Sequence, residues 1–286
     1  MFENYITKIY RFIKKIGLNK LGFIFILFLI KPIIFVFAKT KKLSLFPQEN
    51  WGTKLRYLLG WYEHETVIIS KKYIKPGMKI LDIGGDIGYF TRLFSKLTGQ
   101  TGTVWVFEPE PNSYKMLRKN ISSSKYKNVI SIPKALSDKE EIVTLFQMDV
   151  PAKHSFYNTS KINNEIKCKK EIKIHATTID NFLELQGNPK IDFIKMDIEG
   201  AEPKALKGML KTAKKSRKLI MLIEYNARAL ELGGSTALKF LKQIYDMGFT
   251  IQAILSGGKL KEIDKHIHII AKESYINLLC VKTTKH

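Results

Sequence analysis

The chain has 286 residues, of which 45% are hydrophobic and 11% aromatic, and a formal net charge of +22. This length and apolar content suffice for one sizeable domain with an appendage, and they argue against an intrinsically disordered chain. The two cysteines, Cys168 and Cys280, give neither a disulfide framework nor the Cys/His spacing of a zinc site, which favours a reducing compartment.

Residues 1–47 are predicted to form a membrane-associating segment. Apolar side chains recur at three- and four-residue steps over residues 2–16, with basic residues between them, as in an amphipathic helix. An apolar run then covers residues 21–38 and is interrupted by Lys31 and Pro32. A spanning helix needs about 20 predominantly apolar residues, so this run is marginal for crossing a bilayer.

Four arrangements of this segment stay open. A cleaved signal peptide is disfavoured because the apolar region is late, split, and followed by lysines instead of small residues. A full span and a helix packed on the soluble domain are two others, but basic residues on both flanks set no orientation for a span. An interfacial or re-entrant anchor bent at Pro32 is favoured, because both basic flanks then lie on anionic headgroups.

Strands and helices are predicted to alternate through the second domain, residues 48–286. Apolar runs predict seven strands, at Lys79–Ile83, Thr103–Phe107, Asn128–Ile132, Ile191–Met196, Lys218–Ile223, Phe249–Leu255 and Ile276–Val281. Helices are predicted at Lys54–Lys72, Tyr89–Lys96, Asn112–Ser122, Pro203–Ala213 and Ser235–Met247. This alternation is typical of a parallel α/β sheet covered on both faces. Residues 140–178 are predicted to form an inserted hairpin or loop region.

A glycine-rich turn follows the first strand in "ILDIGGDIGYF". Open α/β sheets bind ligands at such turns. Asp86, however, stands where a dinucleotide fingerprint needs its middle glycine, and its charge would repel a pyrophosphate. The turn suits a ligand with an amino-acid end instead, because Asp82 can receive an ammonium group while Gly84 and Gly88 let the backbone approach closely.

Glu108 ends the second strand, 20 residues after Gly88. A carboxylate at that position can accept both hydroxyls of a ribose. S-adenosylmethionine (SAM) has both an amino-acid end and a nucleoside end, so the two motifs together predict SAM as the cofactor. The alternative is that Asp82 caps a helix and that Glu108 is a solvated strand end.

A second group of charged residues follows the fourth strand, in "IDFIKMDIEGAEPKALKGM". Lys195, Asp197 and Glu199 alternate, so they share one side if the strand conformation persists. The fourth strand is expected beside the first, and Glu224 ends the next strand along the chain. These acids predict either a general base for an acceptor hydroxyl or a divalent-cation site made by Asp197, Glu199 and Glu224. Helix capping, with Lys195 paired to one acid, is the structural alternative.

Three stretches resemble the FkbM-type methyltransferases, a branch of the class I SAM-dependent fold. They begin "MKILDIGGDIGYF", "ISIPKALSDKEE" and "TTIDNFLELQGNPK", and the resemblance covers roughly residues 60–255. Its most distinctive part is the KxDxEGxE element from Lys195 to Glu202. The resemblance implies a Rossmann-like, doubly wound, seven-stranded sheet with one antiparallel strand, SAM at the carboxyl ends of the strands, and O-methylation, often of sugar or polyketide hydroxyls.

The resemblance also assigns roles to single residues. It places cofactor contacts at Gly84, Gly88 and Glu108, and an adenine cradle at Ala135 and Leu136. The family commonly has Ala-Asn where this loop has Gly85 and Asp86. The added negative charge of Asp86 should weaken SAM binding unless it meets the ammonium group of SAM or a lysine.

These features favour a membrane-associated SAM-dependent methyltransferase that O-methylates a hydroxyl of a glycan, a lipid-linked saccharide or a related metabolite. Since SAM is cytosolic, the catalytic domain is expected on the cytoplasmic face of a membrane with an anionic surface. The charge suggests an RNA or DNA methyltransferase, but the Asn/Asp-Pro-Pro-aromatic element of base-methylating enzymes is missing after the fourth strand. The third alternative is a non-catalytic, membrane-tethered binding module on a degenerate methyltransferase fold.

Overall fold

The computed structural model describes residues 43–122, 126–149, 154–158, 160, 167–263 and 275–282. Residues 1–42, which carry the predicted amphipathic helix and apolar run, lie outside these ranges. None of the helices in the described ranges has the length and apolar character that crossing a bilayer requires. The chain divides into two compact units, residues 1–62 and 63–286, whereas the predicted domain boundary follows residue 47.

The described part of the first unit contains helix α3 (Trp51–Leu59). The Asn50 side chain caps the start of this helix, and Gly60 ends it in the left-handed conformation with φ 75°. Helix α4 (His64–Tyr73) then begins the second unit. The single helix predicted over Lys54–Lys72 is therefore wrong, because the chain turns at a glycine that the apolar pattern did not reveal as a helix end.

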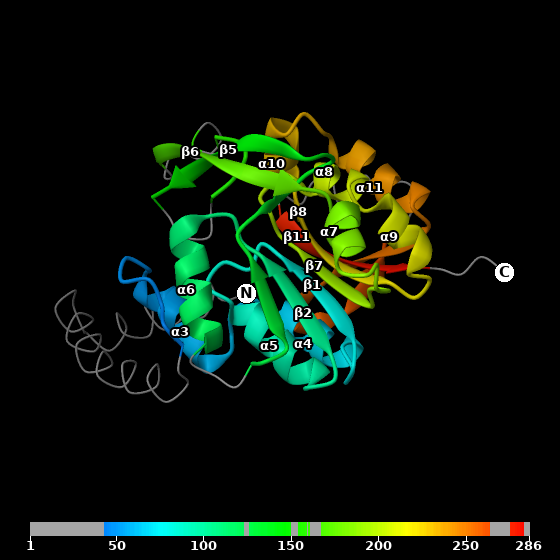
Figure 1. The fold of residues 1–286 in the computed structure, drawn as a ribbon, viewed down its shortest axis with the longest axis horizontal. Helices are drawn as coiled ribbons and strands as arrows, with labels where there is room; N and C mark the ends of the chain where they lie inside the picture. Colours follow the sequence, from blue (N-terminus) through cyan, green and yellow to red (C-terminus); the bar gives the residue numbers. More distant parts are fainter. Residues whose placement is uncertain are drawn as a thin grey trace, which may run out of the picture. The chain divides into compact units, whose positions relative to one another are not determined.

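The second unit is built on a mixed sheet with the strand order β10-β9-β11-β8-β7-β1-β2-β3. Figure 1 labels five of these strands, β11, β8, β7, β1 and β2. The strands from β8 to β3 in this order run parallel, and β11 is antiparallel to both of its neighbours. Their bounds are β1 (Lys79–Ile83), β2 (Thr103–Phe107), β3 (Val129–Ile132), β7 (Phe193–Met196), β8 (Ile220–Asn226), β9 (Phe249–Ile254), β10 (Leu260–Glu262) and β11 (Tyr275–Lys282).

All seven predicted strands are present in this sheet, but the predicted strand count is wrong because an eighth strand extends it. The added strand, β10, pairs antiparallel with β9 after the short 3-10 helix η2 (Ser256–Gly258). Three-residue strands carry too little apolar pattern to be predicted from a sequence. Without β10, the sheet has seven strands and a single antiparallel member, as predicted.

Helices cover both faces of the sheet, which confirms the doubly wound arrangement. Their bounds are α5 (Tyr89–Thr98), α6 (Pro111–Ser122), α7 (Ile179–Leu185), α8 (Glu202–Lys207), α9 (Leu210–Lys215), α10 (Ala227–Leu232) and α11 (Ala237–Asp246). The largest core cluster joins alternate strand residues, such as Leu81 and Ile83, to side chains of α7, α8, α9 and α11. The other face meets α5 and α6, for example where Phe94 contacts Phe193.

The structure also contains a second, three-stranded sheet, with the strand order β4-β6-β5. It consists of β4 (Ala135–Leu136), β5 (Glu141–Met148) and β6 (Cys168–Thr177). Strands β5 and β6 pair antiparallel along their length, within the region 140–178 that was predicted as an inserted hairpin or loop. We call residues 141–177 the insertion hairpin.

The predicted helix Pro203–Ala213 is divided in the structure into α8 and α9. Gly208 lies at the break, where a Cβ atom would meet the carbonyl oxygen of Ser137 at 2.2 Å. The close approach of two backbone segments therefore requires a glycine at this break. This contact joins residues far apart in the sequence, so the helical pattern alone could not reveal it.

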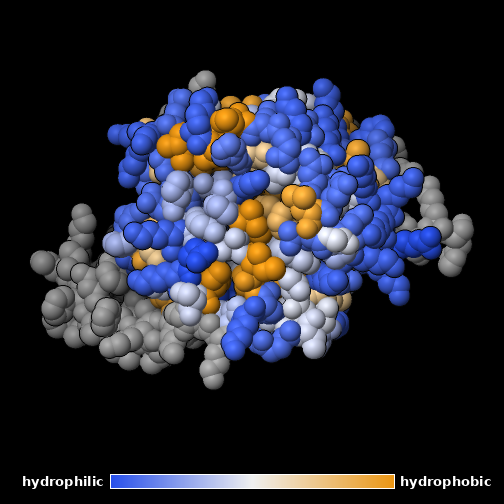
Figure 2. All heavy atoms as spheres, viewed as in Figure 1, coloured by the Kyte–Doolittle hydropathy of each residue, from blue (hydrophilic) through white to orange (hydrophobic). Residues whose placement is uncertain are grey.

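Hydrophilic residues cover most of the face seen in Figure 2, with smaller hydrophobic areas between them. Exposed apolar side chains of the described second unit include Ile130, Ile142, Leu185, Leu210 and Leu238. They come from separate strands and helices. The predominantly hydrophilic face agrees with a chain that has 48 Lys and Arg residues.

Candidate functional site

The glycine-rich turn between β1 and α5 is held by the protein backbone. The amides of Gly84 and Gly85 both donate to the carbonyl of Phe107 at 3.0 Å. Gly84 has φ 85°, and a Cβ atom there would lie 2.0 Å from the carbonyl oxygen of Asp197. At Gly85, a Cβ atom would lie 2.2 Å from the Val106 side chain. Contacts within the protein therefore already require these two glycines.

Glu108 connects the loops that follow β1 and β2. One of its carboxylate oxygens accepts the amide of Asp86 at 2.7 Å, and the other accepts the amide of Glu110 at 2.9 Å. Burial and the neighbouring Asp86 carboxylate raise the pKa of Glu108 to about 8. Because each carboxylate oxygen has two lone pairs, both oxygens retain capacity to accept a ribose hydroxyl.

Asp86 takes the left-handed conformation, with φ 43°. The hydroxyl of Ser113, in the first turn of α6, donates to its carboxylate at 3.1 Å. The Asp86 side chain therefore lies near the start of α6, next to Glu108. A helix N-terminus favours negative charge, which helps to hold Asp86 in this position.

Asp82 is fully buried under α5. The hydroxyl of Thr91 donates to Oδ2 of Asp82 at 2.6 Å, while Oδ1 has no hydrogen-bond partner in the described part of the chain. Burial raises the pKa of Asp82 to about 6, although the nearby Lys195 ammonium lowers it. The unsatisfied oxygen fits a donor such as an ammonium group or a water bound to it.

Ala135 and Leu136 form β4 and are both buried. They pair in parallel with Ala176 and Thr177 of β6. The predicted adenine cradle is therefore a short strand that lies in the chain between β3 and β5 and pairs with β6.

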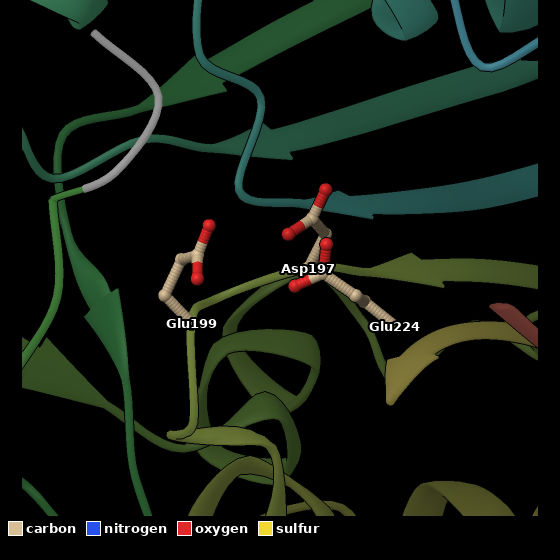
Figure 3. Close-up of side chains that lie close together, drawn as sticks. All are labelled: Asp197, Glu199 and Glu224. Atoms are coloured by element: carbon tan, nitrogen blue, oxygen red, sulfur yellow. The ribbon is translucent and has the colours of Figure 1, made fainter. Parts of the chain in front are cut away.

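Three carboxylates meet at the carboxyl ends of β7 and β8. Carboxylate oxygens of Asp197, Glu199 and Glu224 lie within 4.8 Å of one another, and Figure 3 shows Glu199 facing the other two acids. Glu199 and Glu224 are buried, and Asp197 is half-buried. Glu224 lies inside β8, opposite Asn277 of β11, because β8 extends three residues beyond its predicted end.

Lys195 lies beside this cluster and contributes the opposite charge. Its ammonium is 2.9 Å from the Asp197 carboxylate and lies over the Phe90 ring of α5. Burial lowers the pKa of Lys195, but nearby carboxylates, that of Asp197 first, outweigh burial and raise it. Lys195 is therefore an ammonium ion paired with Asp197. The structural alternative predicted such a pairing of Lys195 with one of the acids.

The expected strand alternation does not continue as far as Glu199. Strand β7 ends at Met196, and Glu199 has φ 50°, a conformation that costs a non-glycine residue about 1–2 kcal/mol. The carboxylate of Glu202 holds this turn by accepting the amides of Ile198 and Gly200, both at 2.9 Å. A tight turn, and not strand geometry, therefore brings Glu199 to the other acids.

Glu202 has a structural role in this arrangement and does not belong to the acid cluster. It is 2% exposed, and burial raises its pKa to about 8. Its two backbone hydrogen bonds fix the turn that begins α8. The cluster that the structure assembles thus consists of Asp197, Glu199 and Glu224.

Sequence reasoning missed three residues that act on this region. The carboxylate of Glu63 contributes to the raised pKa of Lys195, and burial together with Glu224 raises the pKa of Tyr275. Ser155, in the insertion hairpin, donates its hydroxyl to the carbonyl of Glu199 at 2.7 Å. None of these residues stands in a motif, so only the three-dimensional arrangement could reveal them.

The cofactor motif and the acid cluster lie on neighbouring strands. Strands β1 and β7 pair in parallel with Asp82 opposite Lys195, so the two side chains share the face that α5 covers. Glu224 also lies on this face, since it follows Leu222, the partner of Lys195 in β8, by two residues. The fourth predicted strand is thus adjacent to the first, as predicted.

Residues 82–252 match the family described as the Methyltransferase FkbM domain. The chain belongs to the FkbM methyltransferase family. The matched residues include the glycine-rich turn, Glu108 and all three acids of the cluster, and they leave out Glu63 and Tyr275.

This FkbM chain is also similar to individual methyltransferases. It is 25% identical over 164 residues to Methyltransferase 1 of Beauveria bassiana, an alignment that covers 51% of this chain and 66% of that relative. The chain thus spans less than two thirds of the relative's length.

Two solved structures are similar to this chain at lower identity. Precorrin-6y C5,15-methyltransferase from Geobacter metallireducens has a TM-score of 0.47 and 10% identity, covering 85% of this chain and 95% of its own. Fibrillarin from Aeropyrum pernix, solved with natively bound S-adenosyl-L-methionine, has a TM-score of 0.41 and 12% identity. This alignment covers 76% of this chain and 73% of the fibrillarin chain.

Proposed function

We propose that this FkbM chain is a SAM-dependent methyltransferase that transfers the methyl group of SAM to a hydroxyl of a glycan, a lipid-linked saccharide or a related metabolite. One observation carries the proposal: Glu108 and the acid cluster stand at the same, carboxyl edge of a parallel sheet, the edge at which open α/β sheets bind their ligands.

The residues after β1 and β2 fit the cofactor. Glu108 keeps acceptor capacity on both oxygens for the two ribose hydroxyls, and the buried Oδ1 of Asp82 lacks a donor that an amino-acid ammonium could provide, directly or through water. SAM supplies a methyl group on a positively charged sulfur, which is open to attack by an oxygen nucleophile. Ala135 and Leu136 would then contact its adenine.

The acid cluster fits the acceptor side of the reaction. A carboxylate there would accept the proton of the acceptor hydroxyl as its oxygen attacks the methyl carbon. The bond between that carbon and sulfur would break at the same time, and its electron pair would leave SAM as a neutral thioether. Asp197 is the favoured base because it is the least buried of the three acids and is oriented by the Lys195 ammonium. Glu199 and Glu224 would hold the acceptor through hydrogen bonds to its hydroxyls.

A divalent cation is the second candidate for this cluster, because three carboxylates within 4.8 Å offer the oxygen ligands that Mg²⁺ and Ca²⁺ prefer. The ion would orient the acceptor hydroxyl and lower its pKa. The two roles differ in one measurement. Activity that a chelator removes and Mg²⁺ restores supports the cation, whereas activity that persists in chelator supports the base alone.

The test of the function is transfer of a labelled methyl group from SAM into lipid and glycan extracts, followed by identification of the labelled product. Asp197→Asn should lower turnover by about 100-fold or more while SAM still binds, because the base is lost but the cofactor contacts stay. Wild-type protein that labels none of these extracts, or an Asp197→Asn variant with full turnover, would contradict the assignment.

We place this activity at the cytoplasmic face of a membrane. The proposal is supported by the basic, apolar sequence of residues 1–42 and by the cytosolic supply of SAM. The expected partners are an anionic membrane surface and a small-molecule, glycan or lipid-linked acceptor. Nucleic acid is not an expected partner.

A further inference from the structure

We propose that Ser155 is a positioning residue for the acid cluster, through which the insertion hairpin holds Glu199 in its working conformation. The inference rests on the proposed function, since it concerns the same acids. It adds a residue that no motif contains and gives the hairpin a part in the chemistry.

Ser155 is attached to both of the regions that it would connect. Its amide and carbonyl form an isolated bridge with Phe146 of β5, through hydrogen bonds of 2.8 and 3.3 Å. Its hydroxyl donates to the Glu199 carbonyl at 2.7 Å and accepts the amide of Tyr157 at 3.1 Å. With 1% of its surface exposed, Ser155 makes these contacts away from solvent.

The turn at Glu199 is also confined from the side of α10. A Cβ atom on Gly200 would lie 2.4 Å from the carbonyl oxygen of Ala229. A Cβ atom on Gly233 would lie 2.8 Å from the Gly200 carbonyl oxygen and 3.0 Å from the Tyr157 ring. The turn therefore has α10 on one side and the hairpin segment on the other.

This confinement explains how Glu199 keeps a left-handed backbone. Such conformations persist in non-glycine residues only where the surroundings enforce them, and they concentrate at functional sites. The Ser155 hydroxyl bonds directly to the peptide group that follows Glu199. Its loss would free that peptide group to rotate and would move the Glu199 carboxylate relative to Asp197 and Glu224.

The predicted consequence is a loss of turnover and not of cofactor binding. Ser155→Ala should lower kcat about tenfold, because small displacements of groups at a reacting centre slow the chemical step. The affinity for SAM should stay unchanged, since Asp82 lies in β1 and Glu108 follows β2, away from the turn that Ser155 contacts. Steady-state methyl transfer and calorimetric SAM titration measure the two quantities separately.

Ser160→Ala is the matched control. Ser160 belongs to the same hairpin segment, but its hydroxyl donates to Asn158 within that segment and not to the acid-cluster turn. This variant should retain wild-type turnover. An equal loss in both serine variants would overturn the proposal, because it would indicate general damage to the hairpin.

A double-variant cycle with Glu199→Gln separates positioning from stability. If Ser155 acts through Glu199, adding Ser155→Ala to Glu199→Gln should cost little further turnover. Losses that multiply fully would overturn the proposal. If Ser155→Ala does not fold, the variants Ser155→Thr and Ser155→Val can be compared instead. Threonine and valine have nearly the same shape, and only threonine keeps the hydroxyl. Equal turnover of these two variants would also overturn the proposal.

The outcomes distinguish this inference from the proposed function. Wild-type protein that transfers no methyl group contradicts the proposed function itself. Wild-type turnover that Ser155→Ala leaves unchanged contradicts only the role of Ser155.

Discussion

Glu108 is held by two backbone amides, so the protein itself orients its carboxylate. The same burial that orients it disfavours its negative charge and raises its pKa to about 8. A carboxylate accepts hydrogen bonds from both ribose hydroxyls, whereas its protonated form offers one of its positions as a donor. Binding of SAM should therefore favour the ionised form.

This linkage predicts a pH-dependent affinity for SAM. Since the ionised form binds better and the pKa is about 8, affinity should rise as the pH rises toward and through about 8. Glu108→Gln should bind SAM more weakly, by about tenfold, and should lose most of this pH dependence. Calorimetric titrations across this pH range provide the measurement. An unchanged pH dependence in the variant would show that another group is responsible.

Glu202 gives a second pH effect, this time on stability. Its pKa is about 8 in the folded protein and near the ordinary value of 4.5 in the unfolded chain. Between these values the unfolded chain has released a proton that the folded protein retains, so the free energy of unfolding should fall as the pH rises from about 4.5 to about 8. Asp82 and Glu108 contribute in the same direction.

Urea unfolding at several pH values tests the contribution of Glu202. Glu202→Gln cannot ionise, so its stability should decline less steeply over this range than that of the wild type. Parallel pH profiles for the two proteins would contradict the assignment.

At the scale of the elements, the turn after β7 depends on the approach of α10. Gly200 has a positive φ of 98°, which strains any residue other than glycine. A Cβ atom at this position would in addition lie 2.4 Å from the Ala229 carbonyl oxygen. Gly187 has a similar φ of 78° but nothing within 4 Å of a Cβ atom. Comparison of alanine at the two positions therefore separates backbone strain from the steric clash.

We expect Gly187→Ala to lower the free energy of unfolding by about 1 kcal/mol, from strain alone. Gly200→Ala should cost about 3 kcal/mol or more, because the clash adds to the same strain. Chemical denaturation of both variants measures the difference. Equal losses at the two sites would mean that the turn moves away from α10 at little cost.

The elements differ in how well the sequence predicted them. Strands β1 and β2 were predicted with their observed bounds because short, continuous apolar runs lie between turn residues. The helical pattern did not predict the break between α8 and α9, where Gly208 approaches Ser137, about 70 residues away in the chain. The local apolar pattern thus predicts a strand where burial determines its bounds. It does not predict a helix end that coincides with a contact to a segment distant in the chain.

The candidate site divides in the same way. The acids Asp197, Glu199 and Glu224 were named from their positions near strand ends, and the structure brings them together. The turn geometry that does so was not predicted, because it depends on the amides that Glu202 accepts and on confinement by α10. Ser155 could not be found at all, since nothing in the hairpin sequence indicates that it reaches the turn at Glu199.

At the scale of the whole molecule, the basic charge suggests how the protein meets its acceptor. The net charge of +22 favours association with anionic surfaces, and residues 1–60 contain eleven Lys and Arg against two Glu. Under the proposed membrane association, a lipid-linked acceptor would be concentrated at the same surface as the enzyme.

Flotation with anionic lipid vesicles tests this arrangement. The full-length chain should float with the vesicles, and a chain that starts at Gln48 should not, because it lacks the amphipathic and apolar segments. SAM binding by the shortened chain provides the control for folding. Equal flotation of both chains would place membrane binding elsewhere in the protein.

The parallel pairing of β1 with β7 has a further consequence for the range of molecules that the enzyme can use. Neighbouring strands stay about 4.8 Å apart, and hydrogen bonds along both strands resist any change in that spacing. If the proposed function holds, the sheet keeps the cofactor side and the acid cluster at a fixed separation. Acceptors of different size would then all have to place one hydroxyl at the same position, and only the surrounding loops could accommodate their variety.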